Sequence, residues 1–267
     1  MFLAIDVGNT QTTLGLISGG KVAQRWRLKT DRNDTSDELH ARLRNFLMLR
    51  DLDLEVIEAA AIASVVPVLT DMWEIALGDA LGTRPFVVRG SRDCCLAIAM
   101  PYPEQVGADR IANAVEARDA YGSPAIVVDF GTATNIDVVD GMGQYRGGSI
   151  APGLMLSASA LFAHAAKLAI TPIEVPPAPI GDTTEHAIQS GLVLGVAAQA
   201  EGLVARIKTQ LAEEAKGTEA KALALAAPVI ATGGLSRIIG AATDVFDAVD
   251  MDLTLRGIWR IWLHHQG

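Results

Sequence analysis

The sequence has few cysteines, no excess of basic residues and no long apolar segment, and each of these absences argues against a class of protein. The 2 cysteines are neighbours, Cys94 and Cys95, and a bridge between adjacent residues is strained, so a disulfide framework is excluded. The longest uninterrupted apolar stretches, such as 222–231, run for about ten residues, too short to cross a bilayer. The chain opens MFLAIDVG with no basic segment before its apolar residues, which argues against a secretion signal. We therefore expect a cytoplasmic protein with no membrane partner.

The charge balance adds a second exclusion. The 267 residues include 22 Lys and Arg against 31 Asp and Glu, for a formal net charge of −9. A general binder of nucleic acid needs a positive field, so we expect no nucleic-acid partner. An anionic substrate fits this charge only where local hydrogen-bond donors hold it. The composition is otherwise that of a folded globular protein, 50% hydrophobic and 20% charged, and the length favours two compact halves.

Several familiar metal and nucleotide motifs are missing too. The 5 histidines show no HExxH or other paired ligand spacing, which argues against a structural zinc site. Neither Gly-x-x-x-x-Gly-Lys-[Ser/Thr] nor Gly-x-Gly-x-x-Gly occurs. Neither a P-loop nor a Rossmann fingerprint can therefore carry nucleotide binding in this chain.

What the sequence does contain is a repeat. Residues 2–17 read FLAIDVGNTQTTLGLI and residues 125–139 read AIVVDFGTATNIDVV, and each is an apolar strand, an acidic turn and a second strand. Each unit continues through a glycine turn into a third segment, at 21–30 or 144–150, which predicts a β-meander. Because Asp6 and Asp129 are separated by close to half the chain, we interpret the repeat as a duplicated domain.

Helical patterns follow each meander. A capping box, Thr35 to Glu38, opens one helix, Pro67 follows a strand at 59–66 and opens another, and a third runs from residue 108 to a stop at Gly122. In the second half, residues 182–185 open a long helix and a strand at 227–231 runs into the turn at Gly233. Meanders combined with such units predict an α/β fold with a mixed helix-flanked sheet in each half, divided into domains 1–118 and 119–267.

The acidic turns are the first candidate site. In Asp6-Val7-Gly8-Asn9-Thr10, a carboxylate ends a buried strand, a glycine allows a sharp bend, and two polar side chains follow, which suits polyphosphate with its Mg²⁺. One isolated copy is explained equally well by ordinary turn chemistry. Two matching copies favour a site in which both turns clamp ATP, with the Gly233-Gly234 turn as a wall on the nucleoside side.

The second candidate is Gly107-Ala108-Asp109-Arg110 at a predicted helix start. A carboxylate and a guanidinium side by side could serve as general base and anion clamp. They could also be a first-turn Asp that favours the helix dipole and a solvated Arg. The residues themselves leave both interpretations open.

Taken together, these motifs resemble those of type III pantothenate kinases, in the same order and over nearly the whole chain. The GADR and DFGTAT blocks are specific to that family rather than to its superfamily. The matching segments are Asp6 to Thr10, PEQVGADRI at 103–111, DFGTAT at 129–134, GSIAPG at 148–153, TEHAIQSG at 184–191, TGG at 232–234 and DLTLRG at 252–257.

The resemblance implies a fold, an activity and two cofactors. The family belongs to the acetate and sugar kinase, heat-shock chaperone and actin superfamily, whose duplicated ribonuclease-H-like domains, as in actin-like ATPases, bind ATP in the interdomain cleft. The implied reaction is ATP-dependent phosphorylation of pantothenate at its 4′-hydroxyl, the first step of coenzyme A biosynthesis. It uses Mg²⁺ with ATP, and K⁺ or NH₄⁺ as an activating cation.

The resemblance also assigns residues. The implied ATP-binding residues are Asp6, Val7, Gly8, Asn9, Thr10, Gln11, Thr12, Thr13 and Thr132, and the implied pantothenate-binding residues are Gly107, Ala108, Asp109, Arg110 and Thr184. Asp109 is the implied proton acceptor, Asp129 the implied ligand of the monovalent cation, and Asp6 the implied ligand of Mg²⁺, directly or through water. Thr184 matches a threonine that reaches pantothenate in the partner subunit, so we expect a homodimer.

The sequence departs from the family pattern at two positions, and two rival functions stay open. Met100 stands where many members have a tyrosine, Tyr102 is out of register with that position, and Thr183 replaces the usual Asn. One rival is another small-molecule kinase or phosphohydrolase of the superfamily, which the GADR block argues against. The other is a non-enzymatic ATP-binding regulator of transcription, which has no need of a base such as Asp109.

Overall fold

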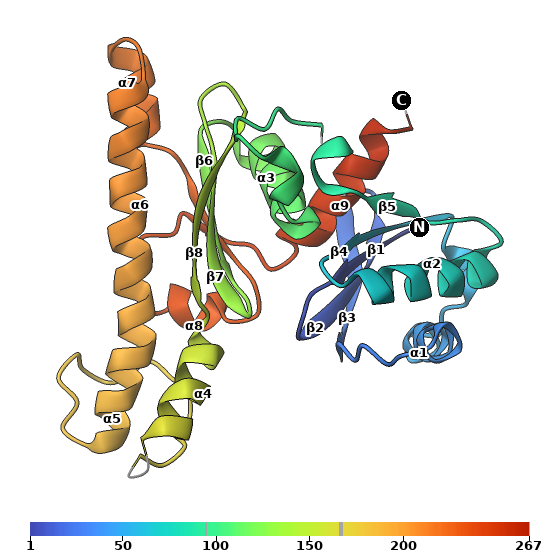
Figure 1. Cartoon of the computed structure of the whole chain (residues 1–267), viewed down its shortest axis with the longest axis horizontal. Helices are drawn as coiled ribbons and strands as arrows, with labels where there is room; N and C mark the ends of the chain where they lie inside the picture. The colour runs from blue at the N-terminus through green and yellow to red at the C-terminus, as the bar shows by residue number, and fades with distance from the viewer. Residues whose placement is uncertain (94, 166–167, 267) are drawn as a thin grey trace. The chain divides into compact units, whose positions relative to one another are not determined.

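The computed structural model describes residues 1–93, 95–165 and 168–266 (Figure 1). The chain divides into two compact units, Met1–Glu116 with Asp252–Gly267, and Ala117–Met251. This division differs from the boundary expected from the repeat, between residues 118 and 119, chiefly because the last residues pack with the first unit. Cys94 lies outside the described residues, and Cys95 is half-buried.

The first unit holds a five-stranded mixed sheet of order β3-β2-β1-β4-β5, in which β1 pairs antiparallel with β2 and parallel with β4. The capping box predicted at Thr35 and Glu38 is present, with Thr35 Oγ1 accepting from the Glu38 N–H. The elements are β1 (Phe2–Val7), β2 (Gln11–Ser18), β3 (Lys21–Lys29), α1 (Ser36–Met48), β4 (Ala59–Ser64), α2 (Pro67–Leu81), β5 (Phe86–Val88), α3 (Ala108–Tyr121), which runs on into the second unit, and α9 (Leu253–His264), with 3₁₀ turns at Leu54–Val56, Gly90–Arg92 and Pro103–Gln105.

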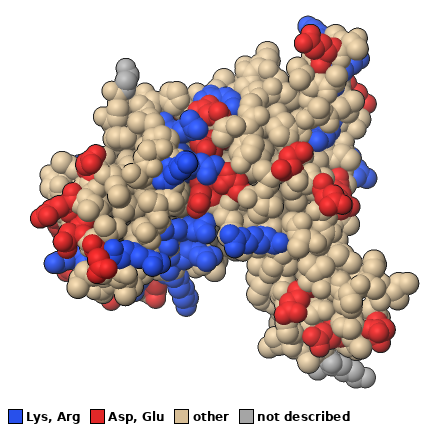
Figure 2. Space-filling model, turned by 180° about the vertical axis from the view of Figure 1, so that it is seen from behind, with Lys and Arg blue, Asp and Glu red and all other residues tan. Residues whose placement is uncertain are grey.

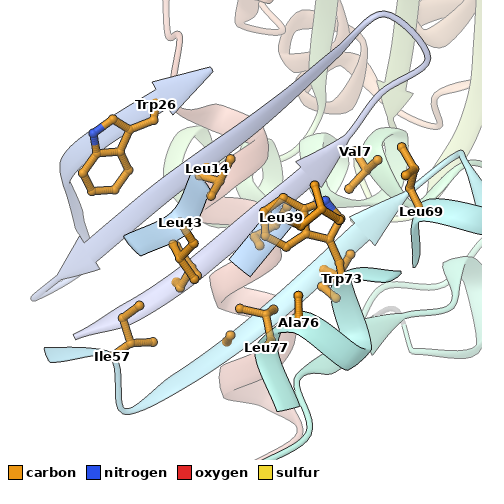
Figure 3. Close-up of a cluster of buried hydrophobic side chains, with 14 of the residues drawn as sticks. Val7, Leu14, Trp26, Leu39, Leu43, Ile57, Leu69, Trp73, Ala76 and Leu77 are labelled. Carbon is orange, nitrogen blue, oxygen red and sulfur yellow. The ribbon is translucent and has the colours of Figure 1, made fainter. Parts of the chain in front are cut away.

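Alternation along the strands sends one set of side chains to each face of this sheet. Leu3, Ile5 and Val7 of β1 join the core formed with α1 and α2, where Trp73 is fully buried (Figure 3). The intervening residues of β1, Asp6 among them, face the opposite side, on which α9 packs. The carboxylate of Asp6 therefore lies away from the main core.

Helix α9 is fixed by close packing and by a buried charge. At Gly257 a Cβ would lie 1.9 Å from the carbonyl oxygen of Ala112 in α3, so only glycine permits this approach. Glu116 of α3 is 1% exposed and pairs with Arg256 at 2.7 Å and also with Arg260. Residues of the DLTLRG block thus attach α9 to α3 within the first unit.

The second unit repeats the first. Its sheet has the order β10-β9-β6-β7-β8, in which β6 pairs antiparallel with β7 and parallel with β9, so β6 takes the place of β1. The duplication predicted from the sequence is confirmed by this shared topology. The elements are β6 (Ala125–Phe130), β7 (Ala133–Val139), β8 (Tyr145–Pro152), α4 (Leu154–His164), α5 (Thr184–Gln189), a π-helical turn (Ser190–Leu194), α6 (Gly195–Glu214), α7 (Thr218–Leu225), β9 (Val229–Thr232), α8 (Ser236–Gly240) and β10 (Ala248–Val249).

The helix running from Thr184 to Glu214 is the most apolar long element. By length and composition it could cross a bilayer, and 39% of its most apolar window is buried within the structure. One side of it, with Val193 and Ala197, joins the core of the second unit. A core helix of a globular domain has the same properties, so this helix is weak support for a membrane span.

Candidate active site

The first candidate loop follows β1. Asp6 is half-buried and lies between Thr13 of β2 and Ala63 of β4 in the sheet. The Gly8 N–H donates to the Gln11 carbonyl at 3.1 Å and closes a tight turn. A Cβ at Gly8 would lie 2.9 Å from that oxygen, so the turn requires glycine. The backbone therefore bends sharply one residue beyond the strand that carries the Asp6 carboxylate.

This turn is tied to Thr30, the residue that follows β3. The Thr30 hydroxyl donates to the Gly8 carbonyl at 2.8 Å and lies 2.9 Å from the hydroxyl of Thr12. Its N–H donates to the Thr10 carbonyl at 3.0 Å. Thr30 is 8% exposed and Thr12 is 1% exposed, so the contact between their hydroxyls is buried, while the bond to Gly8 is partly buried. The hydroxyl of Thr12, which we expected to meet ATP, is turned toward Thr30.

The remaining residues of the implied ATP-binding segment differ in exposure. Asn9, Thr10 and Gln11 are exposed, Thr13 is half-buried, and Val7 is fully buried in the core. Arg32 donates to Asn9 Oδ1 at 3.2 Å. The exposed part of the segment is thus the turn itself, which is the part able to meet a ligand.

Basic side chains run along β3, and Lys29 and Arg32 are the ones near this loop. Figure 2 shows a face on which Lys and Arg side chains gather, whereas the acidic side chains form smaller separate groups. Residues 21–32 carry five basic side chains and one acidic one, which makes β3 positive in a chain of net charge −9. The basic residues are Lys21, Arg25, Arg27, Lys29 and Arg32.

The second loop follows β6 in the same way. Asp129 is half-buried and lies between Asn135 of β7 and Thr232 of β9. Gly233 has φ +89°, and a Cβ there would lie 2.4 Å from Asp129 Oδ1. Glycine at this position therefore allows the Asp129 carboxylate to lie against the backbone of residue 233.

Thr132 lies in the turn of the second loop. The Gly131 N–H donates to the Ala133 carbonyl at 3.0 Å, and the Gly153 N–H donates to the Thr132 carbonyl at 3.1 Å. A Cβ at Gly153 would lie 2.3 Å from that same Thr132 oxygen. The last glycine of the GSIAPG motif therefore allows the end of β8 to close on the loop.

The block from Gly107 to Arg110 forms the start of α3, as predicted. The Gly107 carbonyl accepts the first bond of the helix, from the Ile111 N–H at 3.1 Å. Asp109 Oδ1 accepts from the Arg110 N–H at 2.9 Å, and a Cβ at Gly107 would lie 2.4 Å from the same oxygen. Glycine thus leaves room for the Asp109 carboxylate to lean over the helix start.

The ionisation of Asp109 is perturbed. Burial raises its pKa above the ordinary aspartate value, and the hydrogen bond from the Arg110 N–H and the Arg110 charge oppose the shift only in part. A first-turn Asp that served only to favour the helix dipole would have its pKa lowered. The raised pKa of a carboxyl at a helix start is typical of functional groups and favours the general-base interpretation.

Within the first unit, the first loop and the start of α3 are neighbours. Val65 follows β4, and its N–H donates to the Val7 carbonyl at 3.0 Å where β1 ends. A Cβ at Gly107 would lie 3.5 Å from Val65 Cγ1. The first unit thus brings the turn after Asp6 and the Gly107–Arg110 block to the same end of its sheet, at the carboxyl ends of the parallel strands.

Thr184, in the second unit, is the exposed first residue of α5. Thr183 caps this helix, with its hydroxyl accepting from the His186 N–H at 3.0 Å. The His186 ring lies 2.6 Å from Asp182 Oδ1, and this hydrogen bond holds the pKa of Asp182 below its usual value. Threonine at 183 therefore performs the capping that an asparagine there would also provide.

Met100, which stands where many family members have a tyrosine, and the nearby Tyr102 differ in exposure. Met100 is half-buried, and the Tyr102 side chain is 61% exposed. Among the described residues, no group of three or more His, Cys, Asp or Glu could hold a metal ion.

Sequence reasoning missed the residues behind the loops. Thr30 carries no motif of its own, and its contacts with residues 8, 10 and 12 depend on the pairing of β2 with β3. Gly153 stood in a recognised motif without an assigned role. A polar residue directly after the third strand of a meander is the signal that could have identified Thr30.

Two sheets share one strand topology, and each has a carboxylate near the end of its first strand. This is the duplicated ribonuclease-H-like fold of the actin-like ATPases. A family model, type III pantothenate kinase, matches residues 2–206. The chain belongs to this family, which confirms the resemblance found in the sequence.

Curated relatives match nearly the full length. The chain is 41% identical over 258 residues to the type III pantothenate kinase of Thermomicrobium roseum, covering 97% of this chain and 95% of that one. It is also 41% identical to that of Moorella thermoacetica, covering 97% of both chains. A Campylobacter jejuni structure described as a Baf family transcriptional activator aligns with TM-score 0.61 and 16% identity, over 99% of this chain and 98% of that one. At that identity the structural match shows the fold alone.

Proposed function

We propose that this protein transfers the γ-phosphoryl group of ATP to the 4′-hydroxyl of pantothenate, the first step of coenzyme A biosynthesis. The observation that carries the proposal is the start of α3, where a carboxylate of raised pKa lies at the same end of the sheet as the first acidic loop. Membership of the pantothenate kinase family supports the same conclusion. Phosphoryl transfer needs positioning and charge neutralisation more than covalent participation, and these parts suit both needs.

The first loop, Asp6 to Thr13, would hold the phosphates of ATP, and Thr132 would contribute from the second loop. Mg²⁺ in kinases is commonly bound by one or two carboxylates together with substrate phosphates. Asp6, half-buried at a strand end beside an exposed turn, fits that mode, directly or through water. The bound metal would offset phosphate charge that the net −9 of the chain opposes.

Asp129 would hold the activating K⁺ or NH₄⁺. Its half-buried carboxylate lies near the end of β6, where Gly233 lets it approach the backbone. Oxygen ligands suit alkali cations, and the paired strands bring the backbone of Asn135 and Thr232 alongside Asp129. Neutralising the phosphate charge is again what the cation would supply.

Asp109 would accept or orient the proton of the 4′-hydroxyl as the alcohol attacks. The Gly107–Arg110 block would bind pantothenate, and the Arg110 guanidinium has the planar geometry that recognises a carboxylate such as that of the substrate. Thr184 would contact pantothenate bound by the partner subunit. Since Asp109 must be ionised to act as a base, its raised pKa places the acid limb of activity above the ordinary aspartate range.

A homodimer is part of this proposal. The α5–α6 helix has an exposed side of small residues, Gly191, Gly195 and Ala198, on which a second helix could pack closely. Large apolar side chains on the neighbouring segments are also exposed: Ile150 at 67%, Met155 at 50%, Leu156 at 54%, Ile170 at 86% and Ile180 at 88%. Exposed apolar surface of this extent is typical of an interface. A fully active monomer in light scattering would overturn the dimer.

The proposed location is the cytoplasm, where ATP and reduced thiols are available. A non-enzymatic regulator of transcription is not favoured, although the Campylobacter jejuni structure is described as a transcriptional activator. A binding protein gains nothing from a half-buried carboxylate such as Asp109, whose pKa is raised by desolvation.

The test is a pantothenate-dependent ADP-release assay, run in sodium and then in potassium. We expect ADP release only when pantothenate is present, with greater turnover in potassium. A panel of other alcohols and sugars, with pantothenate omitted, serves as the comparison. ADP release that is independent of pantothenate, or faster with another acceptor, would assign the protein to a different kinase or hydrolase of this fold.

A further inference from the structure

We propose that Thr30 is a positioning residue of the first loop. Its hydroxyl and its N–H donate to the Gly8 and Thr10 carbonyls and turn them away from the ligand, so that N–H groups of the loop face the phosphates of ATP. The proposal rests on the proposed function only in that the first loop binds nucleotide. The resemblance and the sequence motifs give Thr30 no role.

The directions of the hydrogen bonds at Thr30 can be worked out. A threonine hydroxyl has one hydrogen, and that of Thr30 is donated to the Gly8 carbonyl at 2.8 Å. In the 2.9 Å contact between the two hydroxyls, Thr12 must therefore be the donor and Thr30 the acceptor. With its N–H bonded to the Thr10 carbonyl at 3.0 Å, Thr30 engages the loop at three points.

These bonds fix the direction of the loop N–H groups. In a planar trans peptide, the carbonyl of one residue and the N–H of the next point in opposite directions. Because the Gly8 and Thr10 carbonyls are both turned toward Thr30, the N–H groups of Asn9 and Gln11 point away from it. A carbonyl oxygen facing a phosphate would repel it, whereas an N–H donates to it. Thr30 thus selects the loop orientation that binds an anion.

Thr30 itself is held by a well-ordered connection between β3 and α1. Asp31 Oδ1 accepts from the Asn33 N–H at 3.0 Å, which forms a local turn. Asp34 is 7% exposed and receives two bonds from Arg42, at 2.6 and 2.8 Å. The residue behind the loop is therefore placed by ion pairs and a helix cap rather than by a mobile segment.

The second unit gives an independent comparison. Gly153 follows β8 as Thr30 follows β3, and its N–H donates to the Thr132 carbonyl at 3.1 Å, as the Thr30 N–H does to Thr10. A side chain at 153 is prevented, since a Cβ would lie 2.3 Å from the Thr132 oxygen. The backbone bond is therefore common to both loops, and the hydroxyl bonds belong to the first loop alone.

The experiment compares Thr30→Val with Thr30→Ser, using the intact protein. Valine keeps the shape but loses the hydroxyl, while serine keeps the hydroxyl. Binding of Mg²⁺ with a non-hydrolysable ATP analogue is measured by titration calorimetry, and the KM values for ATP and pantothenate are measured in steady state. Thr171→Val is the matched control, because Thr171 is also 8% exposed, donates to a backbone carbonyl at 3.2 Å and lies in the second unit.

We expect Thr30→Val to weaken nucleotide binding and raise KM for ATP by about 10- to 100-fold, because the partly buried Gly8 carbonyl and the buried Thr12 hydroxyl lose their partner. Thr30→Ser should recover most of that loss, and the KM for pantothenate should change little. A residue that served only the stability of the fold would lower the melting temperature in Thr30→Val without this selective change. Nucleotide affinity equal to that of the native protein, or equal losses for both substrates, would overturn the proposal.

If Thr30→Val does not fold, Thr30→Ala takes its place, because it removes the same hydroxyl and its bond to the Gly8 carbonyl. The expected result is then a several-fold weaker nucleotide affinity, and an unchanged affinity would overturn the proposal. The calorimetry uses nucleotide alone, so it is independent of pantothenate turnover. A native protein that binds the ATP analogue but does not phosphorylate pantothenate would refute the proposed function and leave the role of Thr30 standing.

Discussion

Replacing Asp109 by Asn tests the chemistry and the electrostatics of the site together. Asparagine has the size of aspartate but neither the charge nor the ability to accept a proton. If Asp109 is the proton acceptor, turnover should fall by about 10²- to 10⁴-fold. At about 1.36 kcal/mol for each factor of ten, the transition state loses about 2.7 to 5.4 kcal/mol.

The same substitution should stabilise the fold near neutral pH. Burial raises the pKa of Asp109 in the folded protein above its unfolded value of about 3.9, so the folded state binds the proton more tightly. The stability that this protonation contributes is fully present below the unfolded pKa and is lost as the pH rises through the folded pKa. Asp109→Asn should therefore gain most over the native protein above the raised pKa, and the gain should vanish at acid pH.

Chemical denaturation from pH 4 to 8, with turnover measured on the same samples, checks both effects. Asp37, an exposed Asp in the first turn of α1, provides the control, since Asp37→Asn should cost a few tenths of a kcal/mol through the helix dipole and leave turnover unchanged. If Asp109→Asn behaves like Asp37→Asn, with a small loss of stability and near-normal turnover, then Asp109 only favours the helix dipole and the base assignment is refuted.

Three further substitutions test other contacts. Glu116→Gln leaves Arg256 and Arg260 without their buried anion and should lower the free energy of unfolding, measured in urea, by about 1 to 3 kcal/mol. The loss is limited because both arginines are half-exposed. An unchanged midpoint would show that the ion pairs contribute nothing. Gly257→Ala places a Cβ 1.9 Å from the Ala112 oxygen, an overpacking that should cost about 1 to 3 kcal/mol of stability and lower the melting temperature. This should hold despite the better helix propensity of alanine. A higher melting temperature would contradict this packing. Gly233→Ala should displace the Asp129 carboxylate and abolish the difference between potassium and sodium; retained potassium activation would place the cation elsewhere.

Much of the fold could be predicted because its signals are local. The strands of both meanders and the turns that join them depend on side-chain alternation and glycine over a few residues. The capping box at Thr35 and the helix start at Gly107 depend on bonds between neighbours three or four residues apart. The duplication followed from comparing two such local patterns, and the shared strand order confirms it.

The return of α9 to the first unit could not be predicted in the same way. It depends on contacts across about half the chain, of Gly257 with Ala112 and of Arg256 with Glu116. The sequence shows these residues as a glycine and charges in two separate helical patterns, with nothing local to pair them. The contact of Val65 with Gly107, which brings the two candidate segments together, is equally non-local.

Under the proposed function, the repeated loops suggest how an acidic protein would present hydrogen-bond donors to a polyanion. Long-range charge opposes ATP, since the chain carries net −9, so attraction must be generated within a few ångströms of the phosphates. The carbonyls turned toward Thr30 in one unit, and toward Gly153 in the other, orient these peptide dipoles so that the N–H ends point away from those residues. Lys29, which pairs with Gln11, and Arg32, which donates to Asn9, add positive charge near the first loop. Because backbone donors are fixed by the sheet, the proposed nucleotide site would need no lysine of the P-loop type, a motif that the sequence lacks.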